Sequence, residues 1–391
     1  MSIFAAVTTG KGTGAISTIQ IFGGSAEAVM KKVFKPAGIK PLKFKMGEIL
    51  LGTITDGAKV IDQVTIGCEG PDTFAINCHG NPLIVEMIMQ LLQRHGAALL
   101  TAEQLLKNLL TSQKSADTIA VEAKLAQAQA RTLQGTKIIA NQIDAGLTKK
   151  ARGWLENIDE FSLDKIKAEA NQILQKSQAG KLIIYGCIAV LTGPPNSGKS
   201  TLLNCLAGRR KAIVTDIKGT TRDWVEATCR IDSLSLTLID TAGLDEELAG
   251  PEDTVENAAQ KKTTEILERA DIVLLVLDNS RPVEKLDVRL LERITDKQII
   301  TVLNKSDLPA KFDPGRLTQT LSCTVQISAK EGTGIERLSK KIIKTTGAAD
   351  FDLREPVCFT TRQENLLKKL TNVKAKRQTA SIITELLNGH I

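Results

Sequence analysis

The chain has 391 residues, of which 42% are hydrophobic and 3% aromatic, and its formal net charge is +7. This length predicts two or three domains with buried cores. Seven cysteines without a C-x-x-C pair argue against a disulfide framework and a zinc site, and the lack of aromatic residues among the basic segments argues against a base-stacking platform. The charge permits a polyanionic partner such as RNA, although a mildly basic soluble protein explains it equally well.

Membrane insertion is not expected. No cationic stretch precedes an apolar run at the start of the sequence, and the apolar run "LIIYGCIAVL" (182–191) is too short to span a bilayer. The sequence therefore predicts a cytoplasmic protein without a membrane partner.

Residues 1–101 mix short β-rich runs with one helical pattern. The run "PLIVEMIMQLLQRHGA" has the spacing of an amphipathic helix. Together these patterns predict an α+β N-terminal domain. The β-rich runs are "AISTIQIFG" (15–23), "GEILLGTIT" (47–55), "KVIDQVTIGCEG" (59–70) and "TFAINCHG" (73–80).

The rest of the chain changes character twice. Residues 102–182 are rich in Ala, Leu, Gln and Lys with apolar residues at helical spacing, and this composition returns in 348–391. Between them, residues 183–347 alternate apolar strands such as "LSLTLID", "DIVLLVLD" and "QIITVLN" with helical stretches. We therefore predict an α/β domain with a wound parallel sheet, inserted between two halves of one α-helical domain.

The stretch "GPPNSGKS" (193–200) fits the phosphate-binding pattern G-x-x-x-x-G-K-[ST]. Its glycines allow backbone N–H groups to turn toward phosphate oxygens at a helix N-terminus. Lys199 is expected to reach the β- and γ-phosphates, and the Ser200 hydroxyl is expected to ligate Mg²⁺. The predicted phosphate-binding residues are Asn196, Ser197, Gly198, Lys199, Ser200 and Thr201.

Two later motifs predict that the base is guanine. In "VLNKSD", Asp307 can accept from the N1–H and amino group of guanine, a donor pair that adenine lacks. In "ISAK", a backbone N–H can meet guanine O6. Because these motifs follow the P-loop in order, each after a predicted strand, we expect GTP and GDP as ligands. The inserted domain is therefore predicted to be an α/β P-loop GTPase domain with a Ras-like parallel sheet. The predicted base-binding residues are Asn304, Lys305, Asp307, Ser328, Ala329 and Lys330.

The γ-phosphate and Mg²⁺ are expected to meet the segments between these motifs. "IDTAGL" supplies Asp240 for Mg²⁺ and the amide of Gly243 as a γ-phosphate sensor, and Thr220 or Thr221 of "TDIKGTTRD" can ligate Mg²⁺ in the triphosphate state. Leu244 stands where a Ras-like enzyme carries its catalytic Gln, so another residue must orient water. The acidic candidates are Glu246, Glu247, Glu252 and Glu256.

Several stretches resemble a known family. "GPPNSGKSTLLNCLAG", "TDIKGTTRDWVE" and "IDTAGL" are similar to Era-like bacterial GTPases. The helical domain around the GTPase resembles the MnmE (TrmE) tRNA-modification GTPases, as do "FAAVTTGKGTGAISTIQIFG", "INCHG", "DTIAVEAKLAQAQARTLQG" and "TTRQ". The resemblance covers essentially the whole chain.

This resemblance implies a K⁺-stimulated GTPase that forms a homodimer through its N-terminal domains. It implies a switch glutamate that orients water, here Glu256, or Glu252 if the register is counted forward from "DTAG". It also implies wobble-uridine modification of tRNA with an FAD-dependent partner protein and a bound tetrahydrofolate derivative. The implied roles are catalysis by Glu256, Lys199 and Asn196, Mg²⁺ binding by Ser200, Thr221 and Asp240, and K⁺ binding by Asn196, Thr215, Ile217 and Thr220.

The departures from the family pattern fall on the folate side. The chain ends "LLNGHI" without the C-terminal cysteine motif, Lys11 replaces an arginine, and the segment before "CHG" is shortened. We therefore expect weak folate binding. Cys78 and His79 resemble a nucleophile pair only superficially and are expected to close a buried strand. Two alternatives stay open: an Era-like GTPase of the ribosome-assembly class, and a dimeric GTP-binding scaffold that has lost the tRNA chemistry.

Overall fold

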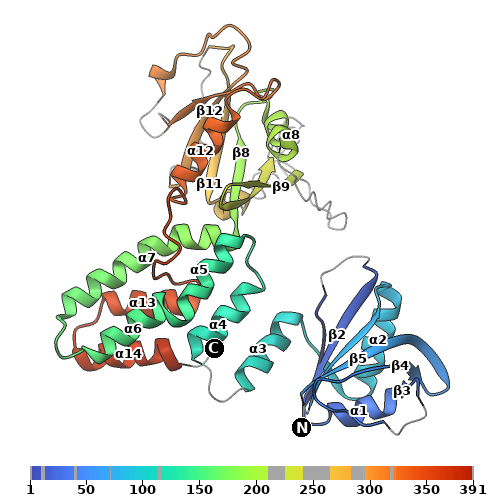
Figure 1. Cartoon of the computed structure of the whole chain (residues 1–391). Helices are drawn as coiled ribbons and strands as arrows, with labels where there is room; N and C mark the ends of the chain where they lie inside the picture. The colour runs from blue at the N-terminus through green and yellow to red at the C-terminus, as the bar shows by residue number, and fades with distance from the viewer. Residues whose placement is uncertain are drawn as a thin grey trace, which may run out of the picture. The chain divides into compact units, whose positions relative to one another are not determined.

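The computed structural model divides the chain into two compact units, Met1–Asp117 and Thr118–Ile391 (Figure 1). It describes the chain except for residues 1, 10–13, 39–41, 71, 113–116, 210–224, 241–264, 283–293, 295, 318–320, 322 and 390–391. Among the described residues, none of the helices has the length and apolar character needed to cross a membrane.

The first unit has the predicted α+β fold and also contains the helix Ala102–Ser112, which lies in the range predicted for the helical domain. Its described strands form one sheet in the order β3-β4-β5-β6-β2-β1-β7, in which only the β1–β7 pair is parallel. Alternate residues of β2, such as Ile19 and Ile21, are fully buried. The Asn81 side chain caps α2 by accepting from the Leu83 N–H, and Pro82 fits its first turn. The elements are β1 (Ile3–Val7), β2 (Ile16–Phe22), α1 (Ala26–Val33), β3 (Phe34–Pro36), β4 (Ile49–Asp56), β5 (Lys59–Gly70), β6 (Thr73–His79), α2 (Pro82–Arg94), β7 (Ala97–Leu99) and α3 (Ala102–Ser112).

The second unit combines a helical part with an α/β part. The helices that precede and follow the α/β part pack together, α13 against α7 and α14 against α6 and α4 (Figure 1). This packing is the arrangement expected for an α/β domain inserted in a helical domain. The helices are α4 (Thr118–Gln127), α5 (Leu133–Asp144), α6 (Gly146–Glu156), α7 (Leu163–Tyr185), α13 (Thr361–Thr371) and α14 (Lys376–Asn388).

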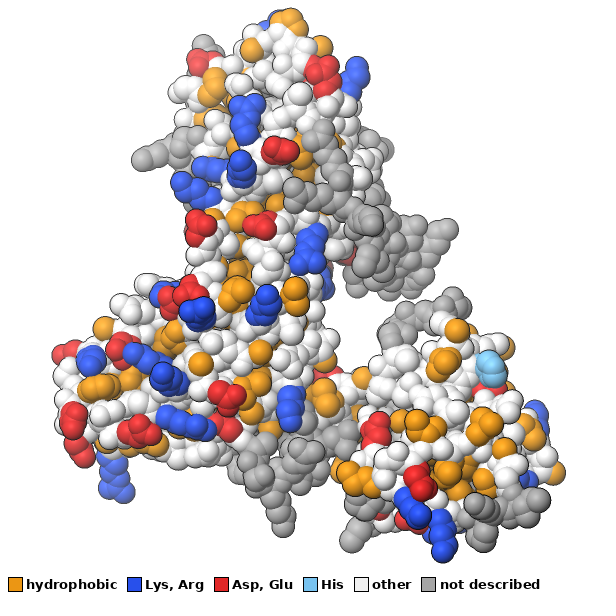
Figure 2. All heavy atoms as spheres, in the orientation of Figure 1, with side chains coloured by type: hydrophobic (Ala, Val, Ile, Leu, Met, Phe, Trp, Pro, Cys, Tyr) orange, Lys and Arg blue, Asp and Glu red, His pale blue; other side chains and the backbone are white. Residues whose placement is uncertain are grey.

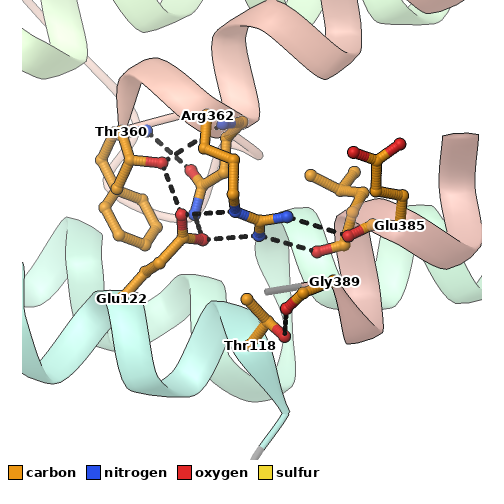
Figure 3. A network of polar contacts seen from close by, with 9 residues as sticks. Thr118, Glu122, Thr360, Arg362, Glu385 and Gly389 are labelled. Atoms are coloured by element: carbon orange, nitrogen blue, oxygen red, sulfur yellow. Dashed lines mark hydrogen bonds and ion pairs between the residues drawn. The ribbon is translucent and has the colours of Figure 1, made fainter. Parts of the chain in front are cut away.

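A buried carboxylate joins the two sequence halves of the helical part (Figure 3). The side chain of Glu122 on α4 is 3% exposed and accepts from both Nε and Nη2 of Arg362 on α13, at 2.8 and 2.9 Å. Thr360 and Gln363 also donate to this carboxylate. Arg362 donates further to the carbonyl oxygens of Glu385 and Leu386 near the end of α14. One polar network therefore joins α4 to α13 and α14, two consecutive helices from a distant part of the sequence.

The α/β part contains a sheet in the order β13-β12-β11-β8-β10-β9, parallel except for β9, which runs antiparallel to β10. Six of the seven residues of β11 are buried, as expected for a strand covered on both faces. The carboxyl ends of β8, β10, β11 and β12 lie at one edge of the sheet, where ligands of such folds bind. The elements are β8 (Cys187–Thr192), α8 (Lys199–Arg209), β9 (Val225–Ile231), β10 (Leu234–Asp240), β11 (Ile272–Asp278), β12 (Gln298–Asn304), η1 (Pro314–Arg316), β13 (Thr324–Gln326) and α12 (Ile335–Thr345).

The helix α7 extends into the apolar run 182–191, the start of which was predicted to be a strand. It continues to Tyr185 and ends at Gly186, whose φ of 90° suits glycine, so β8 begins only at Cys187. The predicted boundary between 182 and 183 thus falls within the last turn of α7. The four domain ranges stay predictions.

Candidate nucleotide-binding site

The P-loop lies between the end of β8 and the start of α8. Three of its residues have positive φ: Gly193 (137°), Asn196 (61°) and Gly198 (94°). A Cβ atom on Gly193 would lie 2.2 Å from the carbonyl oxygen of Val276, and one on Gly198 would lie 2.3 Å from Nδ2 of Asn304. Both positions therefore require glycine for steric as well as conformational reasons.

The polar groups inside the loop are buried. The side-chain Nζ of Lys199 donates to the carbonyl oxygens of Gly193 at 2.7 Å and Pro194 at 3.2 Å, and Lys199 is 4% exposed. The hydroxyl of Ser197 is buried and has no hydrogen-bond partner among the described residues. A buried polar atom of this kind is costly unless a further group meets it, so the loop fits a polar ligand such as a phosphate.

Two oxygen donors stand next to each other at the start of α8. The Ser200 hydroxyl donates to Oδ2 of Asp240 at 2.6 Å, and Asp240, the last residue of β10, is 3% exposed. Hydroxyl and carboxylate oxygens are ligands that suit Mg²⁺. The pair that the sequence predicted for this ion is thus brought together, and Thr201 lies exposed in the same helical turn.

Asn304 connects three loops. It is 2% exposed; its Nδ2 donates to the carbonyl oxygen of Ser197 at 2.9 Å, and its Oδ1 accepts from the N–H of Ala329 at 3.0 Å. The phosphate-binding loop, the "NKSD" loop and the "ISAK" loop are therefore held in one register by a single side chain. Asn304 acts here as a structural clamp.

Lys305 makes a second connection between the "NKSD" loop and the P-loop. It also contacts Asp278, a residue that was not predicted from the sequence. Its Nζ donates to the carbonyl oxygen of Asn196 at 2.7 Å and to Oδ2 of Asp278 at 2.7 Å. Asp278 ends β11, beside Asn304 in the parallel register, and Ser280 donates to its Oδ1 from both N and Oγ. Although burial opposes it, hydrogen bonding from Lys305 and Ser280 holds the pKa of Asp278 below its ordinary value. The signal available in the sequence was an aspartate directly after an apolar strand, as at Asp240.

The predicted base-recognition residues lie together beyond Asn304. The carboxylate of Asp307 is exposed, and hydrogen bonding by the Ser328 hydroxyl lowers its pKa. Ser328 is fully buried and Ala329 nearly so, whereas Lys330 is exposed. A charged carboxylate that faces solvent beside a backbone amide offers the acceptor and donor that guanine needs.

Several predicted residues cannot be placed. The switch and cation residues Thr215, Ile217, Thr220, Thr221, Gly243, Glu252 and Glu256 lie outside the described residues, as do Lys11 and the other acidic candidates Glu246 and Glu247.

In the first unit, Cys78 is buried in β6 and its Sγ lies 3.4 Å from the carbonyl oxygen of Ser17. Burial raises the pKa of this thiol to about 11, so the residue closes a buried strand and is not an activated nucleophile. The same prediction is wrong for His79, whose side chain is 66% exposed and lies with Nδ1 2.7 Å from Oδ1 of Asp62.

Two protein families match parts of this chain. Residues 188–305 match the family described as "50S ribosome-binding GTPase", and residues 3–104 match the family described as "GTP-binding protein TrmE N-terminus". Relatives named "tRNA modification GTPase MnmE" match over most of its length. That of Enterococcus faecalis is 33% identical over 376 residues, 86% of this chain and 80% of its own, and that of Bacillus licheniformis is 32% identical over 88% and 82%. That of a Thermoanaerobacter species is 30% identical over 99% of this chain and 90% of its own. With the P-loop, the Ser200–Asp240 pair and the Asn304 clamp in place, these similarities show that the chain belongs to the MnmE family of tRNA modification GTPases.

Proposed function

We propose that this protein hydrolyses GTP to GDP and phosphate with bound Mg²⁺, in the service of tRNA modification. The residues predicted to bind the phosphates, Mg²⁺ and the base lie together at one edge of the sheet, and this observation carries the proposal. Asn304 links the P-loop to the base-recognition loops, and Ser200 lies 2.6 Å from Asp240. Ser200 and Asp240 would hold Mg²⁺, which would neutralise the negative charge that develops on the phosphates.

The residues of the chain have separate tasks in this proposal. Lys199 donates hydrogen bonds to the phosphates, and the Ser200 hydroxyl and Asp240 hold Mg²⁺ together with Thr221. Asp307 accepts from guanine while Ser328 and Ala329 support the base from the "ISAK" loop. Glu256 orients the attacking water, and Glu252 is the alternative if the register is shifted.

We further propose that K⁺ supplies positive charge at the γ-phosphate. Asn196 supports this idea, because its carbonyl oxygen is fixed by Lys305 while its side chain is exposed beside the P-loop. The amide oxygen of Asn196 is suited to join a cation with Thr215, Ile217 and Thr220. Stabilisation of transition-state charge by one well-placed cation readily supplies a tenfold rate increase, about 1.4 kcal/mol.

Steady-state hydrolysis in K⁺ and then in Na⁺ tests the cation proposal. GTP turnover should be at least about tenfold faster in K⁺. Asn196→Ala should abolish this difference and leave GDP affinity nearly intact, because the Asn196 carbonyl that contacts Lys305 belongs to the backbone. Equal rates in the two salts for the unmodified protein would contradict the proposal.

The purpose of hydrolysis is proposed from the family. Relatives named "tRNA modification GTPase MnmE" support a role in tRNA modification. We propose that this role is wobble-uridine modification, carried out with an FAD-dependent partner protein by a homodimer formed through the first unit. We propose that a tetrahydrofolate derivative binds the first unit only weakly, because Lys11 replaces an arginine of the family pattern. Expression in a bacterium without its own MnmE-type protein, followed by mass spectrometry of tRNA nucleosides, tests this role. Unmodified uridine alongside normal K⁺-stimulated hydrolysis would favour a GTP-binding scaffold instead.

A further inference from the structure

The helical part of the second unit has a hollow of about 680 Å³ that the nucleotide site does not use. It lies between the α5–α6 junction, one face of α6, the middle of α7 and residues 354–356, and we call it the α6–α7 hollow. Four cationic side chains line it: Lys149, Lys150, Lys176 and Arg354. Two carboxylates line it as well, Glu169 and Glu355.

Each carboxylate is already matched by a lysine. Lys150 lies 2.9 Å from Glu169, and Lys176 lies 2.6 Å from Glu355. Burial would raise the pKa of Glu169, but the hydrogen bonds from the Trp154 indole and from Lys150 outweigh it and keep this pKa below its ordinary value. Each carboxylate is thus paired with one lysine, and the charges of these two ion pairs cancel. The hollow keeps a net charge of about +2, carried by the exposed side chains of Lys149 and Arg354.

The position of Arg354 is set by the backbone around it. Its carbonyl oxygen accepts from Nδ2 of Asn141 at 2.8 Å. The buried amide of Gln142 donates to the carbonyl oxygen of Glu355 and accepts from the N–H of Val357. These bonds fix residues 354–357 against α5, so the guanidinium is presented from an ordered segment and less conformational entropy is lost on binding.

The hollow suits phosphates better than bases. Trp154 is 1% exposed and its indole N–H is bonded to Glu169, so its ring offers no stacking face. The Nζ of Lys165 lies 3.5 Å above the ring centroid of Phe161 and covers that face. Single-stranded bases usually need exposed aromatic rings, whereas backbone phosphates need only spaced cations.

The net positive charge of the chain is concentrated in the helical part that contains this hollow. Residues 118–182 and 348–391 together carry 17 Lys and Arg against 12 Asp and Glu, whereas residues 183–347 carry 23 of each. Figure 2 shows Lys and Arg side chains over the helices of the second unit, interspersed with Asp and Glu. Most of the net charge of +7 thus belongs to the helical part, and electrostatic attraction of a polyanion is directed there.

We propose that the α6–α7 hollow docks phosphate groups of the tRNA backbone. The inference rests on the proposed function, from which tRNA enters as the partner, and adds the place at which it is held. The contacts are sequence-independent and position the tRNA without reading its bases.

The test is tRNA binding by the full chain carrying Lys149→Glu and Arg354→Glu, measured over a range of salt concentrations. At about 0.1 M salt the affinity should fall at least roughly tenfold, and the slope of log affinity against log salt should decrease by about two, one for each lost phosphate contact. Lys149→Gln with Arg354→Gln should give a smaller loss in the same direction. Unchanged affinity in a folded double variant would overturn the proposal.

The matched control is Lys340→Glu with Lys344→Glu on α12, where both side chains are exposed. It changes the net charge by the same amount on the part of the chain that carries no excess charge, and tRNA affinity should change little. Equal losses in the two double variants would show a general charge effect and overturn the proposal, as would an absence of tRNA binding by the unmodified protein. GTP turnover and GDP affinity should be normal in both variants, so failure of the GTPase assignment would be seen separately.

Discussion

Asp278 positions Lys305, the side chain that connects the "NKSD" loop to the P-loop. Its Oδ2 and the Asn196 carbonyl oxygen are both 2.7 Å from Nζ of Lys305, whose backbone has a φ of 63°. Asp278→Asn removes the charge from one of these two acceptors, so Lys305 should hold the P-loop less firmly. A hydrogen bond to a charged group contributes about 1.5–3 kcal/mol, and GDP affinity should fall about tenfold or more in a fluorescence titration.

Ser280→Ala provides the control for Asp278. It removes a hydrogen bond to Oδ1 but leaves Oδ2 and Lys305 in contact, so GDP affinity should change less than in Asp278→Asn. If Asp278→Asn lowers only the melting temperature and leaves GDP affinity unchanged, Asp278 supports the fold without positioning Lys305.

Asp307 determines the identity of the base in our second prediction. Its carboxylate is exposed, hydrogen bonding by the Ser328 hydroxyl lowers its pKa, and we expect it to accept from the two guanine donors. Asp307→Asn offers a donor instead, which suits the C2 oxygen of xanthine. The variant should prefer xanthine over guanine nucleotides by roughly a hundredfold, because buried groups without partners are strongly penalised. Competition between GDP, XDP and ADP measures the preference, and equal GDP and ADP affinity in the unmodified protein would rule out the assignment.

At the scale of elements, the network of Figure 3 joins the two sequence halves of the helical part through a buried ion pair. Among the described residues, Arg362→Ala leaves the 3% exposed carboxylate of Glu122 with only the neutral donors Thr360 and Gln363. Loss of one partner of a buried ion pair costs about 3–5 kcal/mol. The midpoint of urea unfolding should therefore fall sharply.

An exposed ion pair on the same helix is the comparison for Arg362. Lys368→Ala on α13 removes a pair with Glu364, which keeps Lys181 as a second partner. This variant should leave the unfolding midpoint almost unchanged. Similar shifts for Lys368→Ala and Arg362→Ala would mean that the buried network contributes no more than a surface pair.

The elements with strong periodicity could be predicted from the sequence, whereas their ends and long-range contacts could not. The alternation in β2 and the apolar run of β11 specify strands, because each has a simple burial pattern. The end of α7 was missed because Ile183 and Ile184 read equally well as strand residues, and only Gly186 marks the break. Asp278 was missed because its role depends on Lys305, which is adjacent only after β11 and β12 pair.

The whole molecule consists of two units with separate cores. The core of the first unit is built from its own sheet and helices, including Ile19, Ile21 and Ile66. In the second unit one core runs from the helices, at Trp154 and Ile183, into the sheet at Ala189. Arg131 strengthens this junction, since its Nη1 donates to Oγ1 of Thr237 and its N–H donates to the carbonyl oxygen of Ile184. The helical and α/β parts should therefore unfold together, and the first unit should unfold by itself.

Hydrogen exchange of the full chain with and without GDP and Mg²⁺ tests this organisation. A ligand at one hundred times its dissociation constant stabilises the folded state by about 2.7 kcal/mol, and this gain reaches every amide that exchanges only when the binding unit unfolds. Core amides of α5, α7 and α13, distant in sequence from the P-loop, should slow together with those of β8, β11 and β12. Amides of β2, β5 and β6 in the first unit should exchange at the same rate in both conditions. Lys199→Ala, which removes a phosphate contact, should weaken the whole effect. Slowing confined to the α/β part would show that the helical part opens independently, in spite of the shared core.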